Sequence, residues 1–299
     1  MLEGKFCLVT GASSGIGLAT ASALAAAGAE LLIVGRDRER TEAARALVSS
    51  SAASAGAPPA RFELADFSSM KEVASLAGRI AASHARLDVL VNCAGAFTSR
   101  RTPTAEGLET QFAVNHLAPF LLTTSLLGLL EGSDDGRVVT VSSGSHYSGK
   151  IRWKDPQHER FYFGLAAYEQ SKLANVLFSY ELARRLGAGS QITVFADDPG
   201  LVNTEMGQKQ GLSPSALFWS LRRRGGTSPE IPAAAIRALV SEARFKGRTG
   251  LYWRDAVPIP SSRRSYSEAD AKRLWALSER LIARALGREA DFPSLGSPS

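Results

Sequence analysis

The feature that most constrains this chain is a regular alternation of short apolar runs with longer segments of helical period. Seven runs have the length of a β-strand, and they cover residues 5–10, 30–35, 61–65, 88–92, 137–142, 191–196 and 250–253. Apolar strands that alternate with helices are typical of a parallel sheet covered by helices on both faces. The sequence therefore predicts a doubly wound α/β fold with a mainly parallel, seven-stranded sheet.

The pattern continues along the chain without a break that would divide it into domains. Short motifs that favour helix N-termini, a serine followed by an acid or by a proline, fall between the runs. They begin at Ser69, Ser228 and Ser267. Residues 49–60 are rich in Ser, Ala, Gly and Pro and lack an apolar period, so we expect a surface loop there. We expect one domain over residues 1–286 and a flexible tail over residues 287–299.

Composition excludes several classes of protein. The chain has 299 residues, of which 44% are hydrophobic and 21% charged, and this balance excludes an intrinsically disordered chain. Its two cysteines, Cys7 and Cys93, lie in or beside apolar runs and are too few for a disulfide framework or a closed zinc site. We therefore expect no metal site and a reducing, cytoplasmic setting.

Membranes and nucleic acids are not expected as main partners. The longest apolar stretch, residues 23–34, is interrupted by polar and small residues and is shorter than the roughly 20 residues that span a bilayer. Only four residues precede the first apolar run, so no signal peptide is expected. The net charge of +6 is scattered, and no groove-reading or RNA-stacking motif accompanies it. Residues 217–219, Leu-Phe-Trp beside an arginine triplet, leave weak contact with a membrane surface open.

A glycine-rich turn follows the first strand directly. The run 6–10 leads into the sequence Gly-Ala-Ser-Ser-Gly-Ile-Gly at residues 11–17, and an alanine-rich helical segment comes next. A strand that enters such a turn and opens a helix gathers backbone N–H groups and the positive helix end at one point, which suits a pyrophosphate. The alternative is a purely structural turn. We favour a Rossmann-type dinucleotide site with Gly11, Ser13, Ser14, Gly15, Ile16 and Gly17 as its cradle.

The end of the second strand distinguishes the two nicotinamide dinucleotides. A site for NAD needs a carboxylate there to bind the ribose 2′-hydroxyl, but this run ends at Gly35 and Arg36 with no acid before Asp37. Arg36 instead offers a planar cation for a 2′-phosphate. The sequence therefore predicts NADP(H). The alternative is that Arg36 only begins a solvated helix together with Arg38 and Arg40.

A second constellation lies on a later helical segment, where Tyr168 and Lys172 stand one turn apart on the same face. A tyrosine with its ordinary pKa of ~10 is a poor acid or base at neutral pH, and a neighbouring cation lowers that pKa. Residues 92–95 and the serine pair 142–143 each lie at the end of a predicted strand, and residues 199–200 follow a third, at the sheet edge where ligands bind. Tyr168 is therefore a candidate proton donor in a crevice shared by these strand ends.

Together these motifs resemble the short-chain dehydrogenase/reductase family over nearly the whole chain. The matching positions are residues 10–17 and 92–95, Asn115, Ser143, Tyr168 with Lys172, and Pro199 with Gly200. Four further features are similar to the retinol-dehydrogenase-like branch of that family. They are residues 115–123, the long spacer between residues 143 and 168, residues 171–178, and Arg-Leu-Trp at 273–275.

The resemblance implies a role for each catalytic position. Tyr168 would protonate a carbonyl oxygen in reduction or deprotonate an alcohol in oxidation, and Ser143 would hydrogen-bond the same oxygen. Lys172 would tune Tyr168 and hold the nicotinamide ribose. Ser143 is preferred to Ser142 because the serine-to-tyrosine spacing is longer in this branch. Asn115 would hold a water that links Lys172 to solvent; alternatively, it is a polar residue that bends its helix.

The resemblance also implies coenzyme contacts. Asp66 would contact the adenine, although it could equally cap the helix that begins near Ser69. Further contacts would come from Asn92, Ala94, Gly95, Pro199, Gly200, Val202 and Thr204. The chain departs from the family at Cys93, where a second asparagine is commoner, and at Asp198, where this branch usually has histidine. The family commonly pairs subunits through the helices that carry the matched asparagine and tyrosine, which implies a homodimer or homo-oligomer.

These observations predict an NADP(H)-dependent oxidoreductase. It would transfer a hydride between nicotinamide and the carbonyl or alcohol carbon of a hydrophobic substrate, which is retinoid-like, steroid-like or another apolar carbonyl. Large apolar side chains in two segments, 144–167 and 205–228, suggest substrate loops that close as a lid, with ordinary packing as the alternative. They are Tyr147, Trp153, Phe161, Tyr162, Phe163, Leu217, Phe218 and Trp219. The alternative function is a catalytically silent protein that binds NADP(H) as a regulator.

Overall fold

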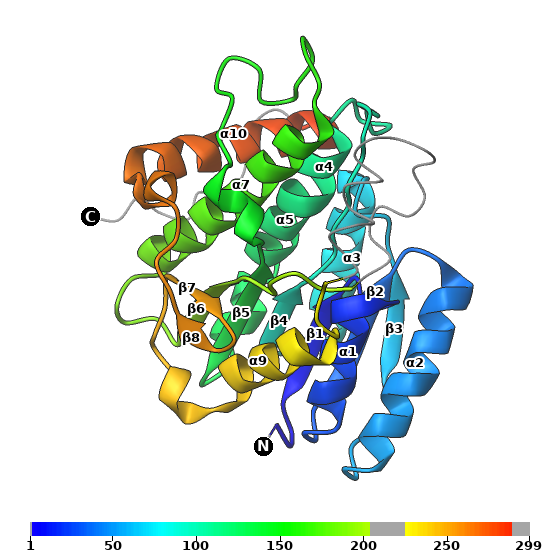
Figure 1. Cartoon of the computed structure of the whole chain (residues 1–299). Helices are drawn as coiled ribbons and strands as arrows, with labels where there is room; N and C mark the ends of the chain where they lie inside the picture. Colours follow the sequence, from blue (N-terminus) through cyan, green and yellow to red (C-terminus); the bar gives the residue numbers. More distant parts are fainter. Residues whose placement is uncertain (1, 204–224, 289–299) are drawn as a thin grey trace.

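A computed structural model describes residues 2–203 and 225–288 (Figure 1). Its sheet has the strand order β3-β2-β1-β4-β5-β6-β7-β8. The strands are β1 (Phe6–Thr10), β2 (Glu30–Gly35), β3 (Arg61–Leu64), β4 (Val89–Asn92), β5 (Gly136–Val141), β6 (Ile192–Asp197), β7 (Leu251–Arg254) and β8 (Val257–Pro258). Strands β1 to β7 are parallel, and β8 pairs antiparallel with β7. The doubly wound α/β fold with a mainly parallel sheet is confirmed, with eight strands in place of the predicted seven.

The additional strand, β8, has two residues and follows a tight turn. Asp255 and Ala256 form that turn, and both have positive φ, at 52° and 56°. Left-handed backbone is usually taken by glycine, asparagine or aspartate, so Asp255 fits this turn but Ala256 does not. The hairpin therefore has only a weak signal in the sequence, without the glycine usual at its second position, which explains why the prediction missed it.

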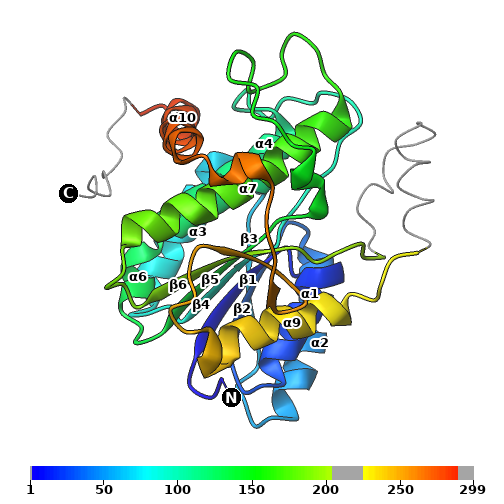
Figure 2. The ribbon, with the colours of Figure 1, turned by 60° about the vertical axis from the view of Figure 1, so that its left-hand side comes forward.

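Helices cover both faces of the sheet, as Figure 2 shows. One face carries α1 (Gly15–Ala25), α2 (Arg38–Ala53) and α9 (Glu230–Ser241), and the other carries α3 (Met70–Ser83), α5 (Ala118–Ser125) and α7 (Gly164–Leu186). Successive strand residues point to opposite faces, so Leu8 and Val138 join one core layer while Val9 and Val139 join the other. Short elements complete the path: α4 (Thr110–Phe112), the π-helix η1 (Ala113–Leu117), α6 (Leu127–Glu131), and the 3₁₀ turns η2 (Gly144–Tyr147), η4 (Ala243–Phe245) and η5 (Arg263–Tyr266).

The predicted helix-start signals hold at two of three places. The hydroxyl oxygens of Ser69 and Ser267 each accept a hydrogen bond from a backbone N–H three residues later, so both caps are confirmed. The cap predicted at Ser228 is wrong. There α9 begins after Pro229, and the Ser228 hydroxyl donates to the carboxylate of Glu230 instead.

The surface loop predicted over residues 49–60 is shorter than expected. Helix α2 continues to Ala53, because Val48 and Ala52 are buried against the sheet and extend its apolar face by a further turn. The serines and alanines of this segment have few large apolar groups, so the periodicity was weak. The structure corrects the prediction to a connection that begins at Ser54.

The last helix of the described chain, α10 (Glu268–Leu286), lies along α7 and also contacts α3 (Figures 1 and 2). Its Trp275 ring packs against Phe120 of α5 at 4.7 Å and against Phe178 of α7 at 5.9 Å between ring centres. The Ser278 hydroxyl lies 2.8 Å from the imidazole Nε2 of His116. Helix α10 thus covers part of the α5 and α7 surface through which a second copy was expected to pair, and the homodimer stays a prediction.

Candidate active site

The carboxyl ends of β1, β4, β5 and β6 open into one cavity of about 880 Å³. It lies where the strand order changes direction, with β1 leading outward to β2 and β4 leading to β5. Such a switch point is where doubly wound sheets bind ligands, because the neighbouring connections diverge to opposite faces. The glycine-rich turn, the second strand's end and the Tyr168 helix all contribute to this cavity.

The turn after β1 has the tight backbone that its glycines predicted. Gly11 has φ +67°, and a Cβ added there would lie 2.7 Å from the Ala94 Cα. A Cβ on Gly17 would lie 2.3 Å from the Gly11 carbonyl oxygen. Helix α1 begins at Gly15, and the side chain of its N-cap, Ser14, makes no capping bond. Every predicted cradle residue lines the cavity: Gly11, Ser13, Ser14, Gly15, Ile16 and Gly17.

Thr10 fastens this turn to the loop after β4. Its hydroxyl oxygen accepts hydrogen bonds from the backbone N–H groups of Cys93 at 3.0 Å and Ala94 at 3.1 Å. Cys93, Ala94 and Gly95 line the cavity as a result. The prediction that Asn92 lines the coenzyme site is not supported: its buried amide donates to the Thr123 hydroxyl at 2.9 Å and does not line the cavity. The Asn92 side chain braces β4 against α5.

One end of the cavity is basic. Arg36 and Arg40 line it together with Asp66, and the Arg36 guanidinium lies 3.9 Å from the Asp66 carboxylate. The Asp37 carboxylate is occupied as the N-cap of α2, where it accepts from the Arg40 N–H at 2.9 Å. The alternative that Asp66 caps the next helix is wrong, because Ser69 is that cap. This end therefore presents cations next to the end of β2.

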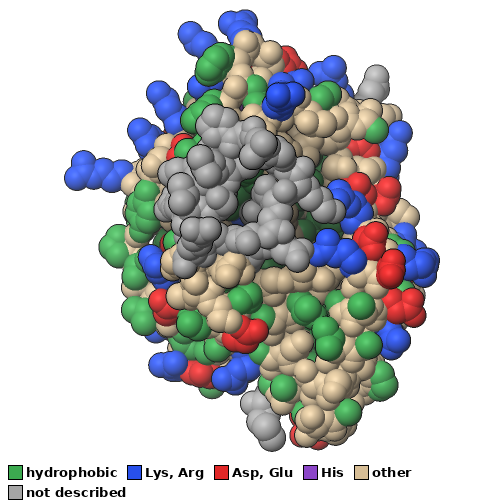
Figure 3. All heavy atoms as spheres, turned by 45° about the vertical axis from the view of Figure 1, so that its right-hand side comes forward, with side chains coloured by type: hydrophobic (Ala, Val, Ile, Leu, Met, Phe, Trp, Pro, Cys, Tyr) green, Lys and Arg blue, Asp and Glu red, His purple; other side chains and the backbone are tan. Residues whose placement is uncertain are grey.

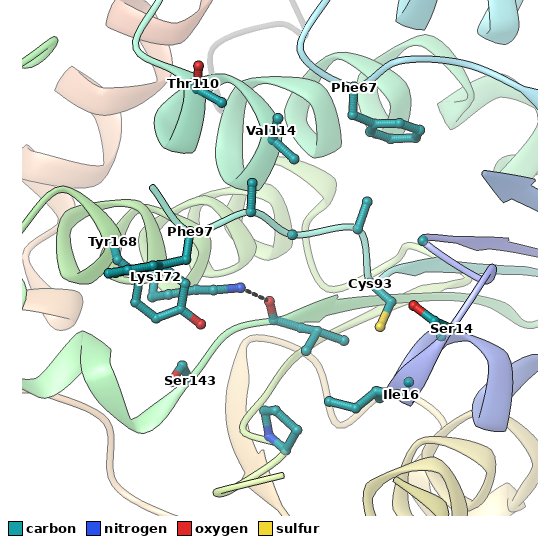
Figure 4. Close-up of a pocket in the computed structure, with 18 of the residues that line it drawn as sticks. Ser14, Ile16, Phe67, Cys93, Phe97, Thr110, Val114, Ser143, Tyr168 and Lys172 are labelled. Atoms are coloured by element: carbon teal, nitrogen blue, oxygen red, sulfur yellow. Dashed lines mark hydrogen bonds between the residues drawn. The ribbon is translucent and has the colours of Figure 1, made fainter. Parts of the chain in front are cut away.

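The other end of the cavity holds the tyrosine and the lysine (Figure 4). Tyr168 and Lys172 lie on α7, 5% and 4% exposed, and both line the cavity with Ser143. Figure 4 shows the Tyr168 hydroxyl pointing toward Ser143, with Lys172 directed to the side. The Lys172 ammonium donates to the Val141 carbonyl at 3.1 Å. The neighbouring Ser142 points elsewhere, since its hydroxyl donates to the Lys172 carbonyl at 2.8 Å.

Burial dominates the titration of these two groups. It raises the pKa of Tyr168 to about 12, opposed by the hydrogen bond to Ser143 and reinforced by the charge of Asp198. The expected net lowering of this pKa is therefore wrong: Lys172 is not among the main causes of the shift, and the pKa of Tyr168 is raised. Burial also lowers the pKa of Lys172 to about 8, against the raising effects of Cys93 and Asp198.

Asn115 lies within the π-helix η1, as a residue at a local change of helical pitch. Its side-chain oxygen accepts from the Ala96 N–H at 2.7 Å, and its amide donates to the Ala96 carbonyl at 3.0 Å and to the Ser171 hydroxyl at 2.9 Å. Asn115 does not itself line the cavity in the described part of the chain. Its side chain joins the loop after β4 to the helix that carries Tyr168.

Several residues around the tyrosine had no signal of their own in the sequence. The Phe97 ring meets the Tyr168 ring edge to face, with centres 5.8 Å apart. Thr110 and Val114 line the wall opposite Ser143, as Figure 4 shows. They come from different loops and helices, and only the fold brings them together.

The first predicted substrate loop, residues 144–167, contributes little to the described cavity wall. Gly144 and Ser145 line it, whereas the aromatic residues of the segment do not. The Trp153 ring packs beneath Arg273 at 4.3 Å, and Phe161 and Phe163 are 67% and 55% exposed. Packing thus accounts for Trp153, and the lid stays a prediction.

The second predicted loop falls mostly beyond the described residues. The apolar residues at 217–219, the arginine triplet at 222–224 and Thr204 all lie outside them. Val202, just before the gap, lines the cavity together with Pro199 and Gly200. The expected contacts of Thr204 and the membrane-surface contact at 217–224 therefore stay predictions.

Three patterns that would indicate other functions are a metal site, a membrane-spanning helix and a basic surface patch. Within residues 2–203 and 225–288 no cluster of three or more His, Cys, Asp or Glu side chains could hold a metal. Each helix in those same ranges is too short or too polar to cross a membrane. Figure 3 shows Lys and Arg side chains distributed around one face without gathering into a single patch.

The chain is similar in sequence and in fold to known proteins. A model described as short chain dehydrogenase covers residues 5–214. Retinol dehydrogenase 14 of Mus musculus and retinol dehydrogenase 13 of Homo sapiens are each 36% identical to the chain over 94% of its length, and over 87% and 85% of their own. A solved, uncharacterized protein from Mycobacterium Paratuberculosis has a TM-score of 0.73 at 30% identity, covering 97% of this chain and 96% of that chain. The Pseudomonas aeruginosa RhlG/NADP active-site complex has a TM-score of 0.65 at 28% identity, covering 85% and 95%. The chain therefore belongs to the short-chain dehydrogenase/reductase family, in its retinol-dehydrogenase-like branch, and is an oxidoreductase of alcohol and carbonyl groups.

Proposed function

We propose that the protein is an NADP(H)-dependent oxidoreductase that interconverts a hydrophobic carbonyl compound and its alcohol. The observation that carries the proposal is the placement of the Tyr168 hydroxyl toward Ser143 in the same cavity as the glycine cradle. A proton donor and a dinucleotide cradle in one cavity are what carbonyl reduction requires.

The residues present fit a dinucleotide. A Cβ at Gly11 or Gly17 would collide with backbone, so the turn keeps the close geometry that lets a pyrophosphate reach the start of α1. Arg36 would hold a 2′-phosphate, with Arg40 beside it, and this supports NADP(H) over NAD(H). The remaining coenzyme contacts would come from Asp66, Ala94, Gly95, Pro199, Gly200, Val202 and Thr204. When bound, the nicotinamide donates or accepts the hydride.

The protein's own groups handle the proton. Tyr168 donates a proton to the substrate oxygen in reduction and accepts it in oxidation, and the Ser143 hydroxyl hydrogen-bonds that oxygen. Lys172, one turn along α7, would orient the nicotinamide ribose, and its ammonium, 5.6 Å from the centre of the Tyr168 ring, would stabilise the phenolate by its charge. The Asn115 side chain holds the adjoining loop in place, and we propose that Asn115 also holds a water that links Lys172 to solvent.

The substrate class follows from the cavity wall and from the relatives. Phe97 and Val114 give the catalytic end an apolar wall. Relatives at 36% identity are retinol dehydrogenases, which supports a retinoid-like, steroid-like or other apolar carbonyl. We also propose that the protein is cytoplasmic and forms a homodimer.

The decisive experiment is a screen of hydrophobic aldehydes, ketones and alcohols with NADPH or NADP⁺, followed by absorbance of the reduced coenzyme. Tyr168→Phe should lower turnover by about 10² to 10⁴ while coenzyme binding is retained. Tyr266→Phe is the matched control, because Tyr266 does not line the described cavity and lies outside both predicted substrate loops, so this variant should keep its activity. Coenzyme binding with no wild-type turnover on any substrate would instead favour the silent regulator, and stronger binding of NADH would refute the coenzyme assignment.

A further inference from the structure

A buried carboxylate joins two loops at the catalytic end of the cavity. Asp198 follows β6 directly, is 2% exposed and lines the cavity. Its Oδ1 accepts a hydrogen bond from the Gly144 N–H at 3.0 Å and another from the Gly200 N–H at 3.0 Å. Gly144 is the residue after Ser143, and Gly200 belongs to the turn that lines the cavity after β6. One oxygen atom therefore fastens the serine loop to that turn.

This tie acts on the loop directly after the serine. Before the serine, the Ser142 N–H donates to the Asp197 carbonyl at 2.7 Å, so the end of β5 is held to β6 up to that residue. After it, the Ser143 hydroxyl oxygen accepts from the Ser145 N–H at 3.2 Å, a bond within the four-residue 3₁₀ turn η2. The Gly144 bond to Asp198 joins the start of this turn to the sheet, since Asp198 itself donates its backbone N–H to the Trp253 carbonyl at 2.8 Å.

We propose that Asp198 is a positioning residue for the reaction: its carboxylate holds Ser143 opposite Tyr168 and presents a negative charge that favours the protonated, donor form of the phenol. The inference rests on the proposed function. Histidine, which the family resemblance leads us to expect at this position, could supply neither an acceptor to both N–H groups at once nor a negative charge.

The charged surroundings of Tyr168 support the second half of this proposal. Lys172 faces the phenol from the same helix, Ser143 from the end of β5, and Asp198 from the end of β6. The Asp198 charge opposes ionisation of the phenol, so that removing it lowers the pKa of Tyr168. Alcohol oxidation needs the phenolate and therefore rises with pH through that pKa, whereas carbonyl reduction needs the phenol.

Other titratable groups also surround the carboxylate and must be kept constant in a test. They are His146, Tyr147, Lys172, Asp197 and Tyr252. Arg254 lies close to the turn, since a Cβ at Gly200 would be 3.2 Å from its guanidinium. Asp255, the residue after Arg254, has a 65% exposed side chain and provides a matched carboxylate that takes no part in the bonds to Gly144 and Gly200.

Two substitutions separate the tie from the charge. Asp198→Asn keeps an oxygen that can accept both N–H groups but removes the charge. It should retain turnover within about threefold at the optimum and move the rising limb of the pH profile for alcohol oxidation down by about half a pH unit or more. Asp198→Ala removes both features and should lower kcat by about tenfold or more, with coenzyme affinity changed far less. Asp255→Asn should leave both readouts at the wild-type values.

Full-length protein is assayed with NADP⁺ across the neutral and alkaline range, with melting temperature measured for each variant. Superimposed pH profiles for Asp198→Asn and wild type would overturn the role of the charge, and wild-type kcat in a folded Asp198→Ala would overturn the tie. If Asp198→Ala does not fold, Asp198→Ser replaces it, because the shorter side chain cannot reach both N–H groups; a tenfold or larger loss of kcat in that folded variant supports the tie, and wild-type kcat would overturn it. Failure of the proposed function is seen separately, as a wild type no more active than Tyr168→Phe.

Discussion

The two ends of the cavity are built by different means. The coenzyme end is made mostly of backbone: a turn whose glycines lie against the Gly11 carbonyl and the Ala94 backbone, at the start of one helix. The catalytic end is made of side chains, from β5, β6, α7 and the loop after β4, joined by hydrogen bonds across more than 50 residues of sequence. A Cβ added to Gly11 or Gly17 would collide with backbone atoms and shift the whole turn. A substitution in the side-chain network instead removes the interactions of one side chain and leaves the others in place. Substitutions should therefore fail in different ways at the two ends.

The largest effect in the comparison is expected from the serine pair at the catalytic end. Ser143→Ala removes the hydroxyl that we place on the substrate oxygen and should lower kcat by about 10² or more, without weakening coenzyme binding. Ser142→Ala is its matched control, because that hydroxyl bonds the Lys172 carbonyl and should cost only about 1 kcal/mol of unfolding free energy. Steady-state kinetics and thermal unfolding of both variants test this. Equal losses of kcat would show that the two serines are not distinguished in function.

A single methyl group should nearly match that effect at the coenzyme end. In Gly17→Ala the new Cβ lies 2.3 Å from the Gly11 carbonyl oxygen, so the turn must shift and coenzyme affinity should fall by about 100-fold. Gly78→Ala, in α3, adds the same methyl group where nothing lies within 4 Å, and it should leave coenzyme affinity unchanged. Fluorescence titration of NADPH measures both. Wild-type affinity in Gly17→Ala would contradict the backbone account of this end.

The same contrast explains how much of the molecule could be predicted from its sequence. Apolar runs and helix caps are local, so the parallel sheet and the start of α3 at Ser69 were predicted correctly. The glycine cradle is also local, and its residues line the cavity as expected.

What the sequence could not provide was the destination of individual side chains. Asn92 is the last residue of β4, at the cavity edge, yet its amide turns toward Thr123, because residue alternation places it on the face that α5 covers. Burial determines the Tyr168 pKa, and burial depends on Phe97 and other residues that no spacing connects to it. The β7–β8 hairpin lacked a glycine signal altogether. The errors therefore have two sources: a long-range contact that redirected a side chain, as at Asn92, and a local pattern that was weak, as at the β7–β8 hairpin.

Removal of the Arg36 charge should produce a smaller effect. Arg36→Ala should weaken NADPH binding by about tenfold and leave NADH binding unchanged, since only the 2′-phosphate distinguishes the two. The expected loss of affinity is only about tenfold because the Arg36 side chain is 69% exposed, and water and salt screen its interactions. Arg38→Ala is the control, because Arg38 lies two residues further along and does not line the described cavity. A parallel loss for both coenzymes would mean that Arg36 supports the fold and does not select the phosphate.

The smallest effect on turnover is expected from a residue that anchors the long segment before α7. The Tyr162 hydroxyl lies 2.7 Å from the Thr98 hydroxyl and accepts from the Gln111 amide at 2.7 Å. Tyr162→Phe leaves these partly buried groups short of a partner and should lower the unfolding free energy by about 1 to 2 kcal/mol. Turnover should stay within about twofold, because Tyr162 does not line the described cavity. Thermal unfolding and kcat/KM separate the two quantities. A large fall in kcat/KM at unchanged stability would show that this segment acts on the substrate directly, and would support the lid that the aromatic residues suggested.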